Sequence, residues 1–105
     1  MISFEAVCAM VRLEPVELER WIAERWVLPE SAASGYMFSD VDVARVRLIA
    51  ELRRDLAVGE EALPLVLRLL DQLYATRRRM RALLRALEAL PEEHRAAVLK
   101  RFEPD

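Results

Sequence analysis

The sequence predicts a mostly all-α protein in which a small headpiece is followed by one long helix. Three observations predict it: apolar residues at helical spacing near the N-terminus, an interruption rich in serine and extended-structure formers, and a glycine-free heptad run after Gly59. A chain of 105 residues can hardly enclose two separate cores. We therefore predict a headpiece over residues 1–58 and a helical arm over residues 59–105.

Two short helices are expected at the N-terminus. Ser3 can cap a helix over residues 4–11, whose apolar side chains recur every three or four positions. Pro15 suits the first position of a second helix, which should run to about residue 25, and Glu17 favours its dipole. Two helices joined by a tight turn make a helix-turn-helix. The expected inward face of the second helix consists of Leu18, Trp21, Ile22 and the aliphatic stem of Arg25.

Residues 26–38 predict a small β-hairpin, or wing. Proline, serine and glycine interrupt any helical run here, while Trp26–Leu28 and Tyr36–Phe38 favour extended strands. The wing would follow the helix-turn-helix directly.

A third helix should begin after Ser39, which forms a pattern like a capping box with Asp42, and should end at Gly59. Its expected apolar face consists of Val41, Ala44, Arg45, Leu48, Ile49, Leu52 and Leu56.

One long helix is predicted from Glu60 to Leu90, because this stretch has no glycine and Pro64 lies in the tolerated first turn. Pro91 should end it before a short final helix over residues 92–102. The apolar stripe of the long helix is wider than a short headpiece can cover, so we predict a homodimer through an antiparallel or bundled helix pair. The expected dimer interface is a heptad seam of Leu63, Val66, Leu70, Leu73, Arg77, Met80, Leu84 and Leu87.

Charge is distributed unevenly along the chain, although the formal net charge is only −2. Residues 1–42 carry three arginines against eight carboxylates, a net charge of −5, whereas residues 43–105 carry 13 basic and 10 acidic side chains, a net charge of +3. A nucleic-acid-binding headpiece normally has the opposite sign, because phosphates are neutralised by Lys and Arg on the docking surface. We therefore expect this headpiece to repel a phosphate backbone.

The order of helix, turn, helix, wing, helix and long helix resembles the MerR-like winged-helix family, and within it the CbpM-like chaperone modulators. Three stretches support the resemblance, Tyr36–Asp40, Ala44–Leu56 and Leu65–Leu73. They supply an aromatic-x-Phe entry, an Arg-x-x-x-Leu-x-x-x-Leu-type helix and a Val-Leu-x-Leu-hydrophobic-Asp segment, in the family's order. One departure is that Arg25-Trp26 stands where such domains often have a glycine before the wing.

The resemblance implies that the chain binds the J-domain of a DnaJ/CbpA-type co-chaperone and inhibits its engagement with DnaK. A J-domain presents a basic helix to DnaK, so a competing inhibitor should offer a complementary acidic surface. The expected partner-binding residues are Glu14, Glu17, Glu19 and Glu24, with Trp26 or Tyr36 as an apolar anchor.

Two other functions stay open at this point. A MerR-like DNA-binding transcriptional regulator would have the same architecture, but the second helix would then bring four glutamates to the major groove, with only Arg20 and Arg25 to contact DNA. An adaptor or assembly protein could use the same surfaces for an unrelated partner. The basic run Arg77–Arg81 with Arg85 could attract nucleic acid, although its arginines should point in several directions around the helix.

We expect no enzyme activity, no cofactor and no metal. The sequence has no glycine-rich phosphate loop, no paired metal ligands and no nucleophile motif. His94 stands near the C-terminus without a second ligand, and Cys8 is expected to be a small core residue. A single cysteine and the absence of a long apolar segment predict a cytoplasmic location.

Overall fold

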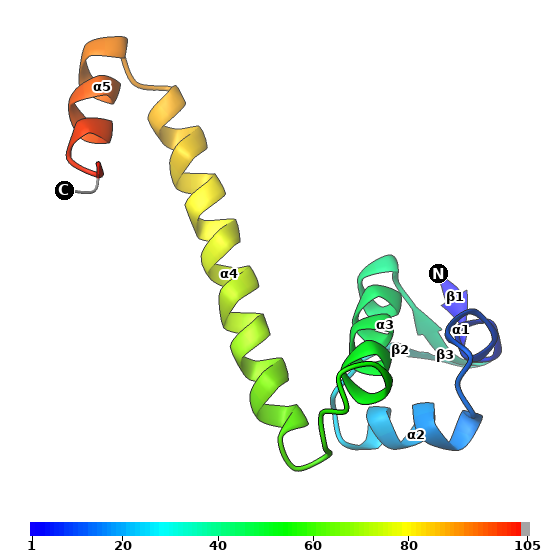
Figure 1. The fold of residues 1–105 in the computed structure, drawn as a ribbon. Coiled ribbons are helices and arrows are strands. Elements are labelled where there is room, and N and C mark those ends of the chain that lie inside the picture. Colours follow the sequence, from blue (N-terminus) through cyan, green and yellow to red (C-terminus); the bar gives the residue numbers. More distant parts are fainter. Residues whose placement is uncertain (104–105) are drawn as a thin grey trace. The chain divides into compact units, whose positions relative to one another are not determined.

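The computed structural model describes residues 1–103, which form five helices and a small three-stranded sheet (Figure 1). The mostly helical content, the winged headpiece and the long helix confirm the predicted fold class. The chain consists of two compact units, Met1–Leu67 and Arg68–Asp105. The first unit contains α1, α2, α3 and the three strands, and the second contains most of α4 together with α5.

The two N-terminal helices lie where the sequence predicts them. Helix α1 spans Phe4–Val11, and the Ser3 hydroxyl caps it by accepting a hydrogen bond from the Ala6 amide at 3.2 Å. Helix α2 spans Pro15–Ala23 and ends about two residues earlier than predicted. The predicted inward position of Arg25 is wrong, because this residue lies beyond the helix end, is exposed and has a φ of 63°.

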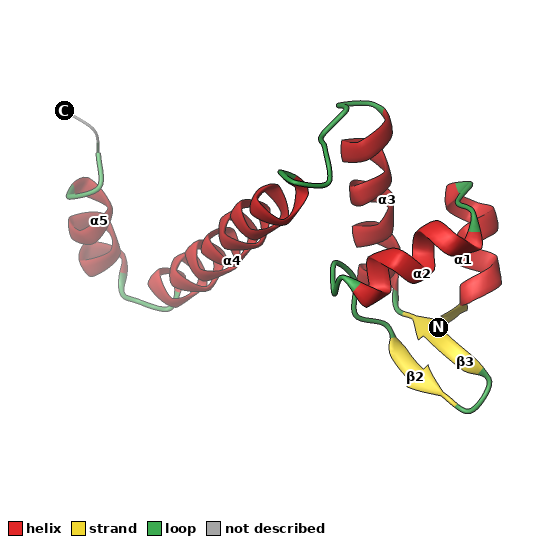
Figure 2. Ribbon diagram, turned by 90° about the horizontal axis from the view of Figure 1, so that it is seen from below, coloured by secondary structure: helices red, strands yellow, loops and turns green. Residues whose placement is uncertain are grey.

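The wing is a hairpin of β2, Glu30–Ala32, and β3, Gly35–Phe38 (Figure 2). Its first strand begins at residue 30 and not at Trp26, because Trp26 and Val27 are both buried and so break the alternation of a strand. The sequence also gave no sign of β1, Ile2–Ser3, which pairs with β3 and completes an antiparallel sheet of order β1-β3-β2.

Helix α3 spans Asp40–Arg54 and begins with the predicted capping box. The Asp42 amide donates to the Ser39 hydroxyl at 3.1 Å, and the Ser39 amide donates to the Asp42 carboxylate at 2.9 Å. The prediction that the helix reaches Gly59 is wrong, because it ends five residues earlier. The predicted apolar face is only partly right, since Val41 and Leu56 are 76% and 64% exposed. The residues of α3 that are buried are Val43, Val46, Ile49, Ala50 and Leu52.

The core of the first unit is built from all three of its helices, the sheet and the start of α4. Phe38 from the wing is fully buried, and its ring lies 6.4 Å from that of Phe4. Leu63 and Leu67, in the first turns of α4, are 0% and 3% exposed. Full burial of such side chains contributes roughly 1.5–3 kcal/mol each. The fully buried large side chains are Val7, Leu18, Val27, Phe38, Val46, Ile49 and Leu63.

Helix α4 spans Leu63–Glu88 and confirms the predicted long helix, with Pro64 in its first turn. A short helix, α5, follows Pro91 and spans Glu92–Lys100, also as predicted. Among the described residues, no helix is both long and apolar enough to cross a membrane.

Candidate partner-binding surface

The candidate site lies on the outer face of α2, and the turn between α1 and α2 holds this helix in position. Arg12 adopts the left-handed conformation that ends α1, with a φ of 59°, and the buried Leu13 donates its amide to the Cys8 carbonyl at 2.9 Å. The guanidinium of Arg54 donates to the carbonyls of Val11, at 3.0 Å, and Arg12, at 2.5 Å. The C-terminal carbonyls of α1 are therefore held by a side chain from α3.

Helix α2 buries one face and exposes the other. Leu18 and Trp21 are 0% and 4% exposed and fix the helix to the core. On the outer side lie two of the predicted partner-binding carboxylates, Glu19 and Glu24, and a third, Glu14, precedes the helix; all three are exposed. Sequence reasoning missed Val16, which is 73% exposed. Its position three residues before Glu19, on the same helical face, was the signal that could have identified it.

Glu17 differs from Glu19 and Glu24 because its side chain takes part in the fold, in a capping box with Glu14. Its carboxylate accepts a hydrogen bond from the Glu14 amide at 3.3 Å at the start of α2. It also lies 3.9 Å from the Arg54 guanidinium. Both contacts are made by one oxygen, Oε1, and the side chain is 45% exposed, so Glu17 serves the helix-turn-helix and still presents negative charge to solvent.

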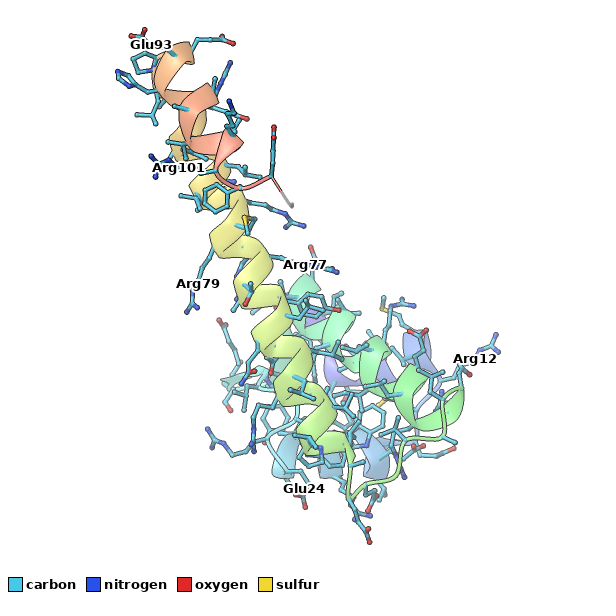
Figure 3. All side chains as sticks on the ribbon, turned by 60° about the vertical axis from the view of Figure 1, so that its left-hand side comes forward. Arg12, Glu24, Arg77, Arg79, Glu93 and Arg101 are labelled. Carbon is cyan, nitrogen blue, oxygen red and sulfur yellow. The ribbon has the colours of Figure 1, made fainter. Side chains whose placement is uncertain are left out.

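The acidic side chains around the first turn of α2 all affect the pKa of the buried Cys8 thiol. The pKa of Cys8 is raised, first by burial and then by the negative charges of Glu5, Glu14, Glu19 and Glu17. Four carboxylates from α1 and the start of α2 therefore lie close enough to share a local negative field. Glu24 lies at the other end of α2, as its C-cap residue (Figure 3).

The arginine on the outer side of α2 is already engaged within the headpiece. The Arg20 guanidinium donates to the Glu60 carboxylate at 2.6 Å, and Arg53 lies 3.6 Å from the same carboxylate. Glu60 therefore neutralises the one positive side chain between Glu19 and Glu24. The surface of α2 presents acidic groups with little free positive charge.

The two predicted aromatic anchors differ in accessibility. Trp26 is buried at 7% exposure, and its carbonyl accepts a hydrogen bond from the Arg45 guanidinium, so it is a core residue with little surface to offer a partner. Tyr36, on β3 of the wing, is 38% exposed. Arg25, before the wing, adopts a positive-φ conformation of the kind that glycine favours, with a φ of 63°.

The predicted dimer seam divides between the two units. Leu63 is fully buried within the first unit and is not available to a second chain. Leu73, Met80 and Leu84 are 43%, 52% and 45% exposed, Arg77 is exposed, and Val66, Leu70 and Leu87 are half-buried. The exposed part of the seam thus begins at Leu73, about three turns later than the sequence indicated.

No group of three or more histidine, cysteine, aspartate or glutamate side chains within residues 1–103 could hold a metal ion.

Comparison with protein families gives a match to the model described as MerR HTH family regulatory protein, over residues 2–85. The searches of curated proteins and of solved structures gave no match. The matched segment contains the helix-turn-helix, the wing, α3 and most of α4. Because it covers more than half of the chain, the protein belongs to the MerR-like helix-turn-helix family of regulatory proteins.

Proposed function

We propose that this protein is a CbpM-like chaperone modulator, which binds the J-domain of a DnaJ/CbpA-type co-chaperone and inhibits its engagement with DnaK. A regulator of this kind acts by binding and catalyses no reaction. The observation that carries the proposal is the negative charge on the outer side of α2, where Glu14, Glu19 and Glu24 are exposed. This is the helix that a DNA-binding relative would insert into the major groove.

The sign of the charge discriminates between the two classes of partner. A duplex carries about one negative charge per 1.7 Å, and binding depends on Lys and Arg that neutralise it. Here Arg20 is paired with Glu60 at 2.6 Å, and the carboxylate offsets its positive charge. A basic helix would instead be attracted to the carboxylates, and charge of this kind mainly raises the association rate and suppresses wrong partners.

The headpiece also offers exposed apolar side chains for the centre of an interface. Val16 is 73% exposed on α2, and Tyr36 is 38% exposed on the wing. Binding energy commonly concentrates in a few apolar or aromatic side chains, whereas charges at the rim contribute less. We assign the anchoring role to Val16 and Tyr36, and the steering role to the glutamates.

The proposed modulator is a homodimer through α4. Leu73, Met80 and Leu84 are exposed and recur at heptad spacing. An apolar stripe of this kind is uncommon on a monomer and is buried most simply by a second copy of the same helix.

The proposal is tested by pull-down of an isolated J-domain with the full-length protein. The charge reversals Glu19→Lys and Glu24→Lys together should abolish capture, since neither side chain is bound elsewhere in the headpiece. The matched control is Glu88→Lys with Glu93→Lys, which changes the charge equally at exposed positions of the second unit. The control should capture the J-domain as well as the wild type does.

Unchanged capture by the Glu19/Glu24 variant would remove the assignment to α2. No capture by the wild type, combined with retention of duplex DNA at physiological salt, would replace the modulator with a MerR-like DNA-binding regulator.

A further inference from the structure

The middle of α4 carries positive charge that the proposed function does not use. Five exposed arginines occur between residues 77 and 85, and no ion pair involves any of them within the described part of the chain. Figure 3 shows Arg77 and Arg79 on different sides of the helix. The five arginines are Arg77, Arg78, Arg79, Arg81 and Arg85.

Three of these arginines share one face with an aromatic side chain. Arg78, Arg81 and Arg85 are separated by three and four residues, and Tyr74 lies four residues before Arg78. Residues at these spacings are neighbours on a helix surface. Tyr74 is 41% exposed, and the three arginines are exposed. We name this set, Tyr74, Arg78, Arg81 and Arg85, the arginine stripe.

The arginine stripe is separate from the apolar seam. At about 100° per residue, the stripe is centred roughly 100° around the helix from Leu73, Met80 and Leu84. A helix that covers those three residues therefore leaves the arginine stripe accessible. The stripe is available to a different partner, whether or not α4 dimerises.

No carboxylate lies within the arginine stripe to offset its positive charge. Arg81 has arginines three and four residues before it and four residues after it, and like charges at these spacings destabilise a helix. Carboxylates in the same helix stand only at its borders, Asp71 before Tyr74 and Glu88 after Arg85. The positive surface is thus bounded at both ends, over about 17 Å from Tyr74 to Arg85.

The length and the residues of the arginine stripe indicate which kind of ligand it would bind. A bounded row of three arginines fits the carboxylates of an acidic helix, which recur at the same spacings, and guanidinium pairs well with carboxylate. The tyrosine ring can cover an apolar side chain of such a helix. A long polyanion would continue past the arginines toward the carboxylates of Asp71 and Glu88 in the same helix.

We propose that the arginine stripe is a second docking surface, which binds an acidic amphipathic helical segment of a partner protein. This surface is independent of the J-domain assignment, because it lies within residues 68–105, whereas the acidic surface lies on α2.

The test is fluorescence anisotropy with a labelled, helix-stabilised peptide whose glutamates recur at spacings of three and four residues beside one leucine. The same peptide with glutamine for glutamate and a short DNA duplex are the comparison probes. The full-length protein is used as wild type, as Arg78→Gln/Arg81→Gln/Arg85→Gln, and as the control Arg68→Gln/Arg79→Gln/Arg101→Gln. Both variants remove three positive charges from the same unit, and circular dichroism verifies their helix content.

We expect the wild type to bind the glutamate peptide, with an affinity that falls as salt rises. The stripe variant should bind about tenfold more weakly, as expected for three exposed ion pairs, and the control should change by less than about twofold. Equal losses in the two variants, no binding of the glutamate peptide, or equal binding of the glutamine peptide would overturn the proposal. Stronger binding of the duplex, lost in the stripe variant, would identify a nucleic-acid site instead. Each of these results leaves the J-domain pull-down unaffected.

Discussion

The Arg54 side chain joins three parts of the headpiece. From α3 it donates to the carbonyls of Val11 and Arg12, which end α1, and it lies 3.9 Å from the carboxylate of Glu17 in α2. It is 41% exposed, so solvent screens the ion pair, and the two hydrogen bonds to carbonyls are the more important contacts. Arg54 therefore helps to hold the two helices of the helix-turn-helix against α3.

Replacing Arg54 with alanine should lower the free energy of unfolding by about 1–2 kcal/mol, because the carbonyls lose a charged donor. Urea denaturation monitored by circular dichroism measures the change. Arg47→Ala, at an exposed position of the same helix, is the control and should change stability by less than about 0.5 kcal/mol. Equal effects of the two substitutions would show that the carbonyl bonds are unimportant.

Cys8 reports the negative field of the candidate site. Because its pKa is raised above 9.0 in the folded state, the unfolded chain loses the thiol proton first as the pH rises. The contribution of Cys8 is therefore fully present below pH 9.0 and is lost as the pH rises through the folded-state pKa. In the Cys8→Ala variant this component of the pH dependence should be absent, as measured by urea denaturation at several alkaline pH values.

Neutralising Glu5 and Glu14, the two carboxylates that raise the pKa of Cys8 most, should make the thiol easier to ionise. In Glu5→Gln/Glu14→Gln, the pH profile for alkylation of Cys8 by iodoacetamide should shift to lower pH than in the wild type. The shift should be partial, because burial is the larger cause. An unchanged pH profile would mean that the charges of Glu5 and Glu14 do not raise the pKa of Cys8.

At the scale of elements, the first turns of α4 belong to the headpiece. Leu63 is fully buried and Leu67 is 3% exposed, while Leu65 between them is 54% exposed. The helix is thus anchored in the core at its start and presents its later leucines to solvent.

Leu63→Ala should destabilise the headpiece by about 2–5 kcal/mol, since it removes a buried side chain from a packed core. Leu65→Ala at the neighbouring exposed position should cost much less, within about 0.5 kcal/mol. Thermal or urea unfolding of the two variants makes the comparison. Similar losses would contradict the placement of Leu63 in the core.

Local signals in the sequence were sufficient for most helix starts, but not for most helix ends. Pro15 and the pair Ser39 and Asp42 identify helix starts, because each acts on the backbone within three residues. The burial of Trp26 and Leu63 was not predictable in this way, because it depends on packing between segments distant in sequence. For the same reason the pattern of α3 placed Val41 and Leu56 inward although both are exposed.

The candidate site was predictable in composition but not in detail. The glutamates of α2 follow directly from the sequence, whereas the ion pair between Arg20 and Glu60 joins residues 40 positions apart. That pair removes a positive charge from the site. The structural role of Glu17 likewise depends on Arg54, which only the folded chain brings within 3.9 Å.

At the scale of the whole molecule, the proposed dimer makes a prediction about mass in solution. Sedimentation equilibrium should give twice the chain mass of 12.1 kDa for the wild type. Replacing the exposed Leu73 and Met80 with glutamate should give the monomer, because charges buried in an apolar interface are costly. The control Leu65→Glu, outside the predicted seam, should remain dimeric. A monomeric wild type would exclude the dimer.

The measurement that tests the central claim most directly is a titration of one labelled J-domain, and in parallel one labelled DNA duplex, with the full-length protein at physiological ionic strength. The acidic surface of α2 predicts saturable binding of the J-domain that weakens as salt is added, together with little or no binding of the duplex. Tight binding of the duplex with no binding of any J-domain would contradict the account.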